Sequence, residues 1–101
     1  MSIDADIQVW LEQPERVSSG VVVPYVVSAH DQDVRYRVRT IQESAGNRAV
    51  TGQTGTLRLM ENTPAALSRL SLSRHAGDHC VIEVTLHGAH DKTVRYQFEC
   101  P

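Results

Sequence analysis

Residues 34–39 of the chain read Val-Arg-Tyr-Arg-Val-Arg, and this stretch gives the clearest structural signal in the sequence. Apolar side chains alternate with arginines, which is the period of two expected for a β-strand with one face on a core and the other in water. The sequence therefore predicts a strand here that places Arg35, Arg37 and Arg39 together on its solvent face.

The same alternation recurs along the chain and sets the expected fold class. It predicts strands over residues 7–12, 20–27, 56–60, 82–86 and 94–98, and a shorter one marked by Leu70 and Leu72. The Thr- and Gly-rich segment 50–55 is weak as a strand, and residues 65–67 are expected to form at most one helical turn. About seven short strands with no longer helix indicate an all-β fold, an immunoglobulin-like antiparallel β-sandwich.

Two positions interrupt this pattern. Pro24 has no N–H group to donate to a strand ladder, so we expect a sheet edge or a bulge there. Ile41 continues the core-facing set of its strand only if the alternation slips near Thr40, through a bulge. Residues 44–47 form a cluster of turn residues after this strand.

Length and composition bound the class of protein. The 101 residues suit one domain, so we assign residues 1–101 to a single immunoglobulin-like β-sandwich domain. The net charge of −2 provides no global basic field that would attract nucleic acid. No apolar run approaches the ~20 residues that a membrane helix needs. Residues 1–4 do not resemble a signal peptide, which leaves a cytoplasmic protein and a removed leader as open alternatives.

Cys80 and Cys100 are the two cysteines of the chain. If the last two strands pair across the turn at 88–91 with Leu86 opposite Val94, counting outward places Cys80 opposite Cys100. Opposed residues in an antiparallel pair lie within disulfide range, so we predict this disulfide, with two buried free thiols as the alternative. A disulfide would indicate an oxidising compartment and would favour the removed leader.

Five histidines raise the question of a metal site. His75 and His79 lie near Cys80, and His87 and His90 lie near a turn, but no spacing matches a known zinc-ligand pattern. The sequence also contains no Gly-x-Ser-x-Gly motif and no glycine-rich phosphate loop. We therefore expect no metal, no cofactor and no enzymatic activity.

The arginine row has two interpretations that charge alone does not separate. In an immunoglobulin-like layout Glu83 and Thr85 lie on the neighbouring strand, with Arg95 one strand further, so the row is a solvated face that Glu83 partly neutralises. Alternatively, the row is a positive stripe that captures an acidic or amide-rich partner.

Five segments together carry a family resemblance: Val34–Val38, Thr56–Leu59, Asn62–Leu72, Asp78 with the strand Val81–Leu86, and Val94–Phe98. On these segments, from the third strand onward, the chain resembles the curli-subunit amyloid inhibitor family of the bacterial periplasm, the CsgC/CsgH type. The run Pro64–Leu72 is its most specific part. One branch of that family has a Cys-x-Cys motif where this chain has Val34 and Tyr36. The chain is thus closer to the CsgH-like branch, and no redox role tied to the motif carries over.

The resemblance implies an immunoglobulin-like fold, periplasmic residence and chaperone-like, ATP-independent inhibition of curli amyloid formation that depends on surface electrostatics. We expect transient, electrostatically guided binding of an unfolded or pre-nucleus subunit, with strand addition to a free sheet edge as a second route. The expected contacts are Arg35, Arg37 and Arg39, with Arg95 and Lys92 as secondary ones. We expect a monomer that binds neither nucleic acid nor membrane.

Two other functions remain open at this point. One is a structural or adhesive β-sandwich binding module of a larger surface assembly, which would hold a stable stoichiometric partner. The other is a thiol-redox accessory protein, which would need an easily reduced bond between Cys80 and Cys100.

Overall fold

A computed structural model describes residues 7–13, 21–72, 78–88 and 93–100, and the regular elements in these ranges are all β-strands. The strands are β1 (Ile7–Glu12), β2 (Val21–Ser28), β3 (Gln32–Ser44), β4 (Asn47–Leu59), β5 (Ala65–Ala66), β6 (Leu70–Ser71), β7 (His79–His87) and β8 (Thr93–Glu99). Across the described ranges, no helix has the length and apolar character needed to cross a membrane.

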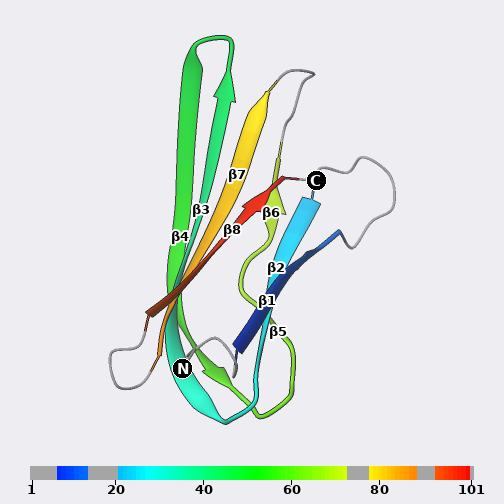
Figure 1. Ribbon diagram of the computed structural model, residues 1–101, viewed down its shortest axis with the longest axis vertical. Coiled ribbons are helices and arrows are strands. Elements are labelled where there is room, and N and C mark those ends of the chain that lie inside the picture. The colour runs from blue at the N-terminus through cyan, green and yellow to red at the C-terminus, as the bar shows by residue number, and fades with distance from the viewer. Residues whose placement is uncertain (1–6, 14–20, 73–77, 89–92, 101) are drawn as a thin grey trace.

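The strands form two antiparallel sheets (Figure 1). One has the order β4-β3-β7-β8, and the other has the order β1-β2-β5, with β6 also pairing with β2. Buried side chains from both sheets form one hydrophobic cluster between them, which confirms the predicted all-β sandwich. The arrangement is consistent with the expected immunoglobulin-like fold. It has two very short strands, β5 and β6, where the sequence predicted a single one.

The core lies between the inward faces of the sheets. Its fully buried members include Val22 and Val26 from β2, and Ile82, Val84 and Leu86 from β7. A polar contact also joins the two sheets, because the hydroxyl of Tyr96 on β8 donates to the backbone carbonyl oxygen of Ile7 on β1 at 3.1 Å. The β4-β3-β7-β8 sheet therefore packs with one face against the other sheet and has its other face in solvent.

The β7–β8 hairpin has the register that the sequence predicts. Ile82 pairs with Phe98, and Leu86 pairs with Val94. Cys80 and Cys100 form the predicted disulfide, with 5.3 Å between their Cα atoms, and the N–H of Cys100 donates to the carbonyl oxygen of Cys80 at 3.1 Å. The disulfide therefore closes the end of the hairpin away from the turn.

The β3–β4 hairpin corrects two expectations. Its register runs without a slip from Gln32 opposite Leu59 to Ser44 opposite Asn47. Thr40 is accordingly the buried core-facing residue, and Ile41 is half-buried on the outer face, so the expected slip does not occur. The weak segment 50–55 is also a regular part of β4, because pairing with β3 supplies the hydrogen bonds that its composition alone does not secure.

Pairing with β2 accounts for the structure opposite Pro24 and for the absence of the helical turn predicted at residues 65–67. Three residues, Leu67–Arg69, lie opposite two residues of β2, Val23 and Pro24, so the ladder contains one extra residue as in a bulge. The sequence predicted a sheet edge or a bulge at Pro24; the structure places Pro24 in the central strand of its sheet, at the point where the pairing with β5 and β6 is interrupted. Ala65–Ala66 is strand rather than helix, because these residues pair with β2.

Candidate functional site

The outer face of β3 carries the arginine row. Arg35 and Arg37 are exposed and Arg39 is half-buried, while the alternate residues Val34 and Val38 lie in the core. Because one face of β3 is buried, the alternate side chains must point to solvent, and the guanidinium groups therefore project from the outer face of the strand. The structure places these three residues as the sequence predicts.

Arg39 is the member of the row that has an acidic partner. Its Nη1 atom lies 3.5 Å from Oε1 of Glu83 on β7, the residue directly opposite in the register. Glu83 also accepts a hydrogen bond from the Gln97 side chain at 3.2 Å. The predicted partial neutralisation by Glu83 therefore applies to one end of the row.

Arg35 and Arg37 make no ion pair with any residue that the structure describes. Arg37 lies opposite Thr85, and Thr85 lies opposite the exposed Arg95 of β8. Arg37 and Arg95 thus sit on one row of the sheet, two strand spacings or about 10 Å apart. We call Arg35, Arg37 and Arg95 the basic patch, since these residues keep a charge that their described neighbours do not neutralise.

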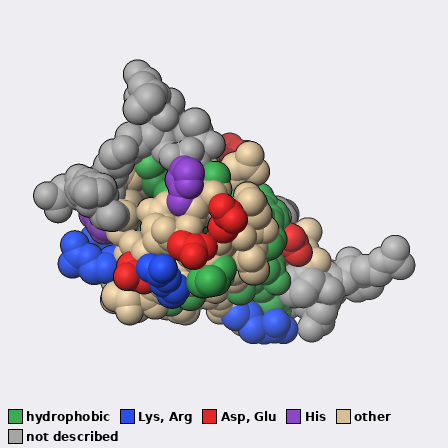
Figure 2. Space-filling model, turned by 90° about the horizontal axis from the view of Figure 1, so that it is seen from below, with side chains coloured by type: hydrophobic (Ala, Val, Ile, Leu, Met, Phe, Trp, Pro, Cys, Tyr) green, Lys and Arg blue, Asp and Glu red, His purple; other side chains and the backbone are tan. Residues whose placement is uncertain are grey.

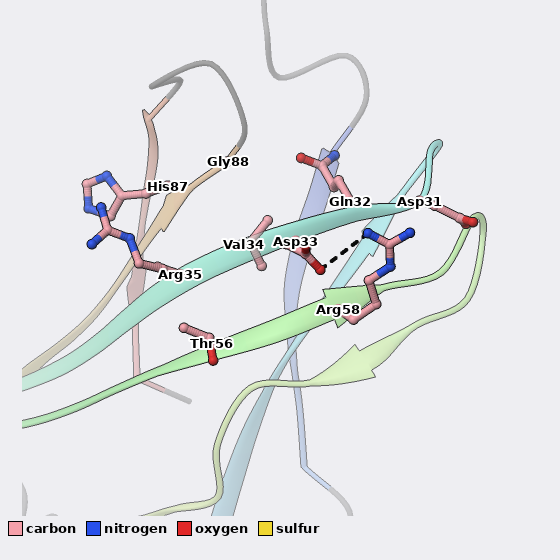
Figure 3. Close-up of a pocket in the computed structure, with 9 residues that line it drawn as sticks. All are labelled: Asp31, Gln32, Asp33, Val34, Arg35, Thr56, Arg58, His87 and Gly88. Atoms are coloured by element: carbon pink, nitrogen blue, oxygen red, sulfur yellow. Dashed lines mark hydrogen bonds and ion pairs between the residues drawn. The ribbon is translucent and has the colours of Figure 1, made fainter.

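Lys92, the other predicted secondary contact, lies outside the described residues. The end of the sheet where β3 begins and β4 ends has mixed charge instead. Arg58 pairs with Asp33, with 3.3 Å between Nη1 and Oδ1, while the side chains of Arg35 and His87 lie close together (Figure 3). Figure 2, which views the molecule from this end, shows blue and red side chains intermixed. A shallow depression of about 450 Å³ lies here, and Asp31 and Asp33 line it together with Arg58 and with Arg35 of the basic patch. This end is therefore a poorer site for an acidic partner than the basic patch.

The structure adds three residues that the sequence analysis did not select. Thr54 and Thr56 of β4 and His87 of β7 line a shallow groove of about 360 Å³ together with Arg35 and Arg37. The groove connects the basic patch to the outermost strand of the sheet. Threonines at alternate positions of β4 were the available signal, but it was hidden by the two glycines of the same segment.

The side chains of this surface are donors and acceptors of hydrogen bonds. Guanidinium groups donate to carboxylates and amide oxygens, and threonine hydroxyls both donate and accept. Within the described ranges, no three His, Cys, Asp or Glu side chains gather as metal ligands. Of the histidines discussed above, His75 and His90 lie outside those ranges.

Comparison with known proteins gives one family match and two similar solved structures. Its residues 4–97 match the family Tafi-CsgC, described as thin aggregative fimbriae synthesis protein. Among solved structures it resembles the E. coli curli protein CsgC, with 24% identity, a TM-score of 0.73 and coverage of 92% of this chain and 96% of the other. It also resembles R. palustris CsgH in a solution structure, with 14% identity, a TM-score of 0.69 and coverage of 92% and 91%.

A search of curated protein sequences found no match to the chain. At these identities the two structures establish the shared fold, whereas the family match spans nearly the whole sequence. The chain therefore belongs to the Tafi-CsgC family of curli-associated proteins.

Proposed function

We propose that this protein is a periplasmic, non-enzymatic inhibitor of curli-subunit assembly, which binds the unassembled subunit transiently through its basic patch. Family membership supports the link to curli. The observation that carries the proposal is the pair Arg35 and Arg37, exposed on a rigid strand and without an acidic partner among the described residues. Arg95 extends this charge across the sheet.

The physical argument concerns capture before nucleation. An acidic, amide-rich subunit is steered toward a positive surface, which raises the rate of encounter. Each exposed ion pair contributes only about 0–1 kcal/mol, so a few of them hold the chain weakly and release it again. Brief contacts of this kind can disfavour the formation of nuclei, which are far fewer than the subunits, without a stable complex. One inhibitor molecule could then act on many subunits.

The disulfide bears on the compartment. Cys80 and Cys100 are bonded and almost fully buried, which suits an oxidising environment such as the periplasm. A buried bond at a hairpin end is also a structural arrangement rather than one built for exchange, since an attacking thiolate needs access to a sulfur atom. This observation makes the redox alternative weaker than the assembly inhibitor.

The test is a thioflavin-T time course of a purified curli major subunit, with the protein added well below equimolar amounts. We expect a lag several-fold longer than without the protein. The variant R35Q/R37Q/R95Q should lose most of this delay, because it removes the patch charge and leaves the core and the Arg39–Glu83 pair in place. Raising the salt concentration should shorten the delay in the wild type, since exposed charges are screened.

The matched control is R69Q, which removes one arginine charge from the segment between β5 and β6 on the other sheet. Compared with the single variant R37Q, it should retain more of the delay. A circular dichroism spectrum establishes that each variant is folded. An unchanged lag with the folded wild-type protein would overturn the proposed function. Full activity of the folded triple variant would overturn the assignment of the patch.

A further inference from the structure

The strand β4 is an open edge of the β4-β3-β7-β8 sheet. It pairs with β3 along its whole length of 13 residues, and among the described strands it has no partner on its other side. Figure 1 shows it on the outside of the sheet, opposite the side where β7 and β8 lie. Ser68 donates a hydrogen bond to the side chain of Gln53, but Gln53 belongs to the inward-facing set, so this contact leaves the outer edge open.

The turn of the hairpin determines which backbone groups of β4 are unused. Ala45 and Gly46 have positive φ values of 46° and 84°, as a two-residue type I′ turn requires. Such a turn makes Ser44 and Asn47 a hydrogen-bonded pair, and the pattern then alternates along the ladder. The residues whose N–H and C=O groups point to the open edge are Arg48, Val50, Gly52, Thr54, Thr56 and Arg58.

This edge lacks the usual devices that prevent strand addition. Natural sheets protect an edge with proline, lysine, an inward-pointing charge or a bulge. The β4 strand contains no proline, no lysine and no acidic residue, and its register is continuous. Its charges are Arg48 and Arg58 near the two ends, and Val50 between them is 46% exposed. An extended chain could therefore pair along the uncharged middle of the strand.

The other described outer strands are poorer edges, and two of them, β5 and β6, have only two residues each. The strand β8 has seven residues, in which Arg95 is balanced by Glu99, and β1 has six residues with Glu12 as its charged member. On length and charge together, β4 is the edge that an extended acidic or amide-rich segment would select.

A second copy of this chain fits the same edge badly. Two β4 strands paired antiparallel about Gln53 would place Arg48 of each copy opposite Arg58 of the other. Like charges directly opposite in a ladder are destabilising, and the arginines of β3 lie only one strand spacing, about 4.8 Å, further in. Charge therefore favours an acidic or uncharged partner strand over self-association.

We propose that the open edge of β4, between Val50 and Thr56, receives an extended amide-rich segment of the curli subunit as an added antiparallel strand. This inference rests on the proposed function and identifies how the captured chain is held. Side chains on the outer face of the added strand lie beside Thr54 and Thr56, about two strand spacings from Arg37. Acidic residues of the segment can reach the basic patch from there, so steering and pairing act at one contiguous site.

The test uses a proline that blocks the edge without breaking the existing sheet. The N–H of Thr54 points to the open edge, so T54P removes a donor needed by an added strand but no hydrogen bond to β3. The matched control is Q97P on β8. The bond from Cys100 N–H to Cys80 sets the alternation on that strand, and Gln97 N–H then points to the outer edge of β8. T54P should shorten the thioflavin-T lag toward that of the subunit alone, whereas Q97P should keep the delay.

A second measurement reports on the edge directly. Amide hydrogen exchange is followed by NMR with and without a synthetic peptide of eight residues, blocked at both ends, with alternating Gln and Val and one Asp near each end. We expect exchange to slow about tenfold or more at the β4 edge amides and to stay unchanged on β8. The amides to be followed are those of residues 50, 52, 54 and 56 on β4 and residues 93, 95, 97 and 99 on β8.

The outcomes separate the two proposals. If the wild type gives no delay, the proposed function fails, and the curli segment as occupant of the edge fails with it. If the wild type and folded T54P delay assembly equally and the β4 amides are not protected by the peptide, the edge inference is overturned while the patch proposal stands. Protection of the β4 amides that grows with protein concentration in the absence of peptide would assign the edge to a second copy and would also overturn the inference. Should T54P fail to fold, peptide protection in the wild type decides.

Discussion

The two hairpins of the β4-β3-β7-β8 sheet differ in how much of their length they bury. In the β7–β8 hairpin every second residue of β7 is buried, from Cys80 to Leu86, and a disulfide ties its end. In the β3–β4 hairpin the outer strand has one buried residue, Leu59 at its far end, and the first eight residues of β4 are exposed. The β7–β8 hairpin therefore contributes to the core, while β4 presents its length to solvent.

The difference follows from composition and position. The β7 strand supplies apolar side chains at each inward position, whereas the middle of β4 supplies threonine, glycine and glutamine. The turn end of the β3–β4 hairpin also projects past the second sheet (Figure 1), so its inward face has little to pack against. A segment that buries so little is stabilised mainly by its ladder to β3, which is a suitable design for a surface that receives a partner.

The strand β3 contributes both to the core and to the exposed surface. Its inward residues Val34 and Val38 belong to the core, and its outward residues Arg35 and Arg37 belong to the basic patch. Because the two sets alternate on one backbone, stability and recognition can be altered separately by choosing the face. The predictions below use this separation.

The largest effect is expected from L86A. Leu86 is fully buried between the sheets, so its truncation should cost roughly 3–5 kcal/mol of the free energy of unfolding. The control V50A alters an aliphatic residue that is 46% exposed, and it should change stability by about 0.5 kcal/mol or less. Urea denaturation followed by circular dichroism measures both. Equal losses in the two variants would contradict the contrast between the hairpins.

Removal of the disulfide should have the next largest effect. Cys80 and Cys100 are 20 positions apart, and closing a loop of that size stabilises by about 3 kcal/mol in the chain-entropy picture. The C80S/C100S variant should therefore unfold at lower urea, yet delay curli assembly as the wild type does wherever it is folded. Loss of the delay with unchanged stability would instead support the redox function.

The sequence was sufficient where aliphatic alternation is strong. It predicted the register of the β7–β8 hairpin, the disulfide, and the position of Glu83 beside the arginine row, because one buried face determines the phase of each strand. The row itself was visible for the same reason. These features depend on local pattern and on a single pairing of neighbouring strands.

The sequence was insufficient where a partner strand decides the structure. The segment 50–55 has weak intrinsic strand character, and β3 makes it part of a long strand. Ala65–Ala66 favours a helical turn locally, but hydrogen bonds to β2 make it a strand. Ile41 lies on the outer face because the continuous β4 ladder leaves no room for the slip that would bury it. The open edge at β4 could not be seen until this pairing was known.

A smaller effect is expected at Gly55, where the inner face of β4 is closely covered. A Cβ atom there would lie 2.7 Å from Oη of Tyr36, so G55V must displace the end of the tyrosine ring, at a cost of about 1 kcal/mol. At Gly52 the nearest atoms would be 3.7 Å away, so G52V should be close to neutral or slightly stabilising. Urea midpoints compare the two variants. If both cost the same, Tyr36 does not anchor this part of the hairpin.

The smallest effect on stability, and the most informative for recognition, is expected from E83Q. It removes the carboxylate 3.5 Å from Arg39, but both side chains are partly exposed, so stability should change by about 0.5 kcal/mol or less at low salt. The freed Arg39 charge then joins the basic patch and should lengthen the curli lag by roughly twofold. The control E99Q makes the same charge change on β8, where Glu99 has no ion pair with any described residue. A longer lag for E83Q than for E99Q would show that charge acts at the arginine row itself, whereas equal lags would mean that net charge alone controls capture.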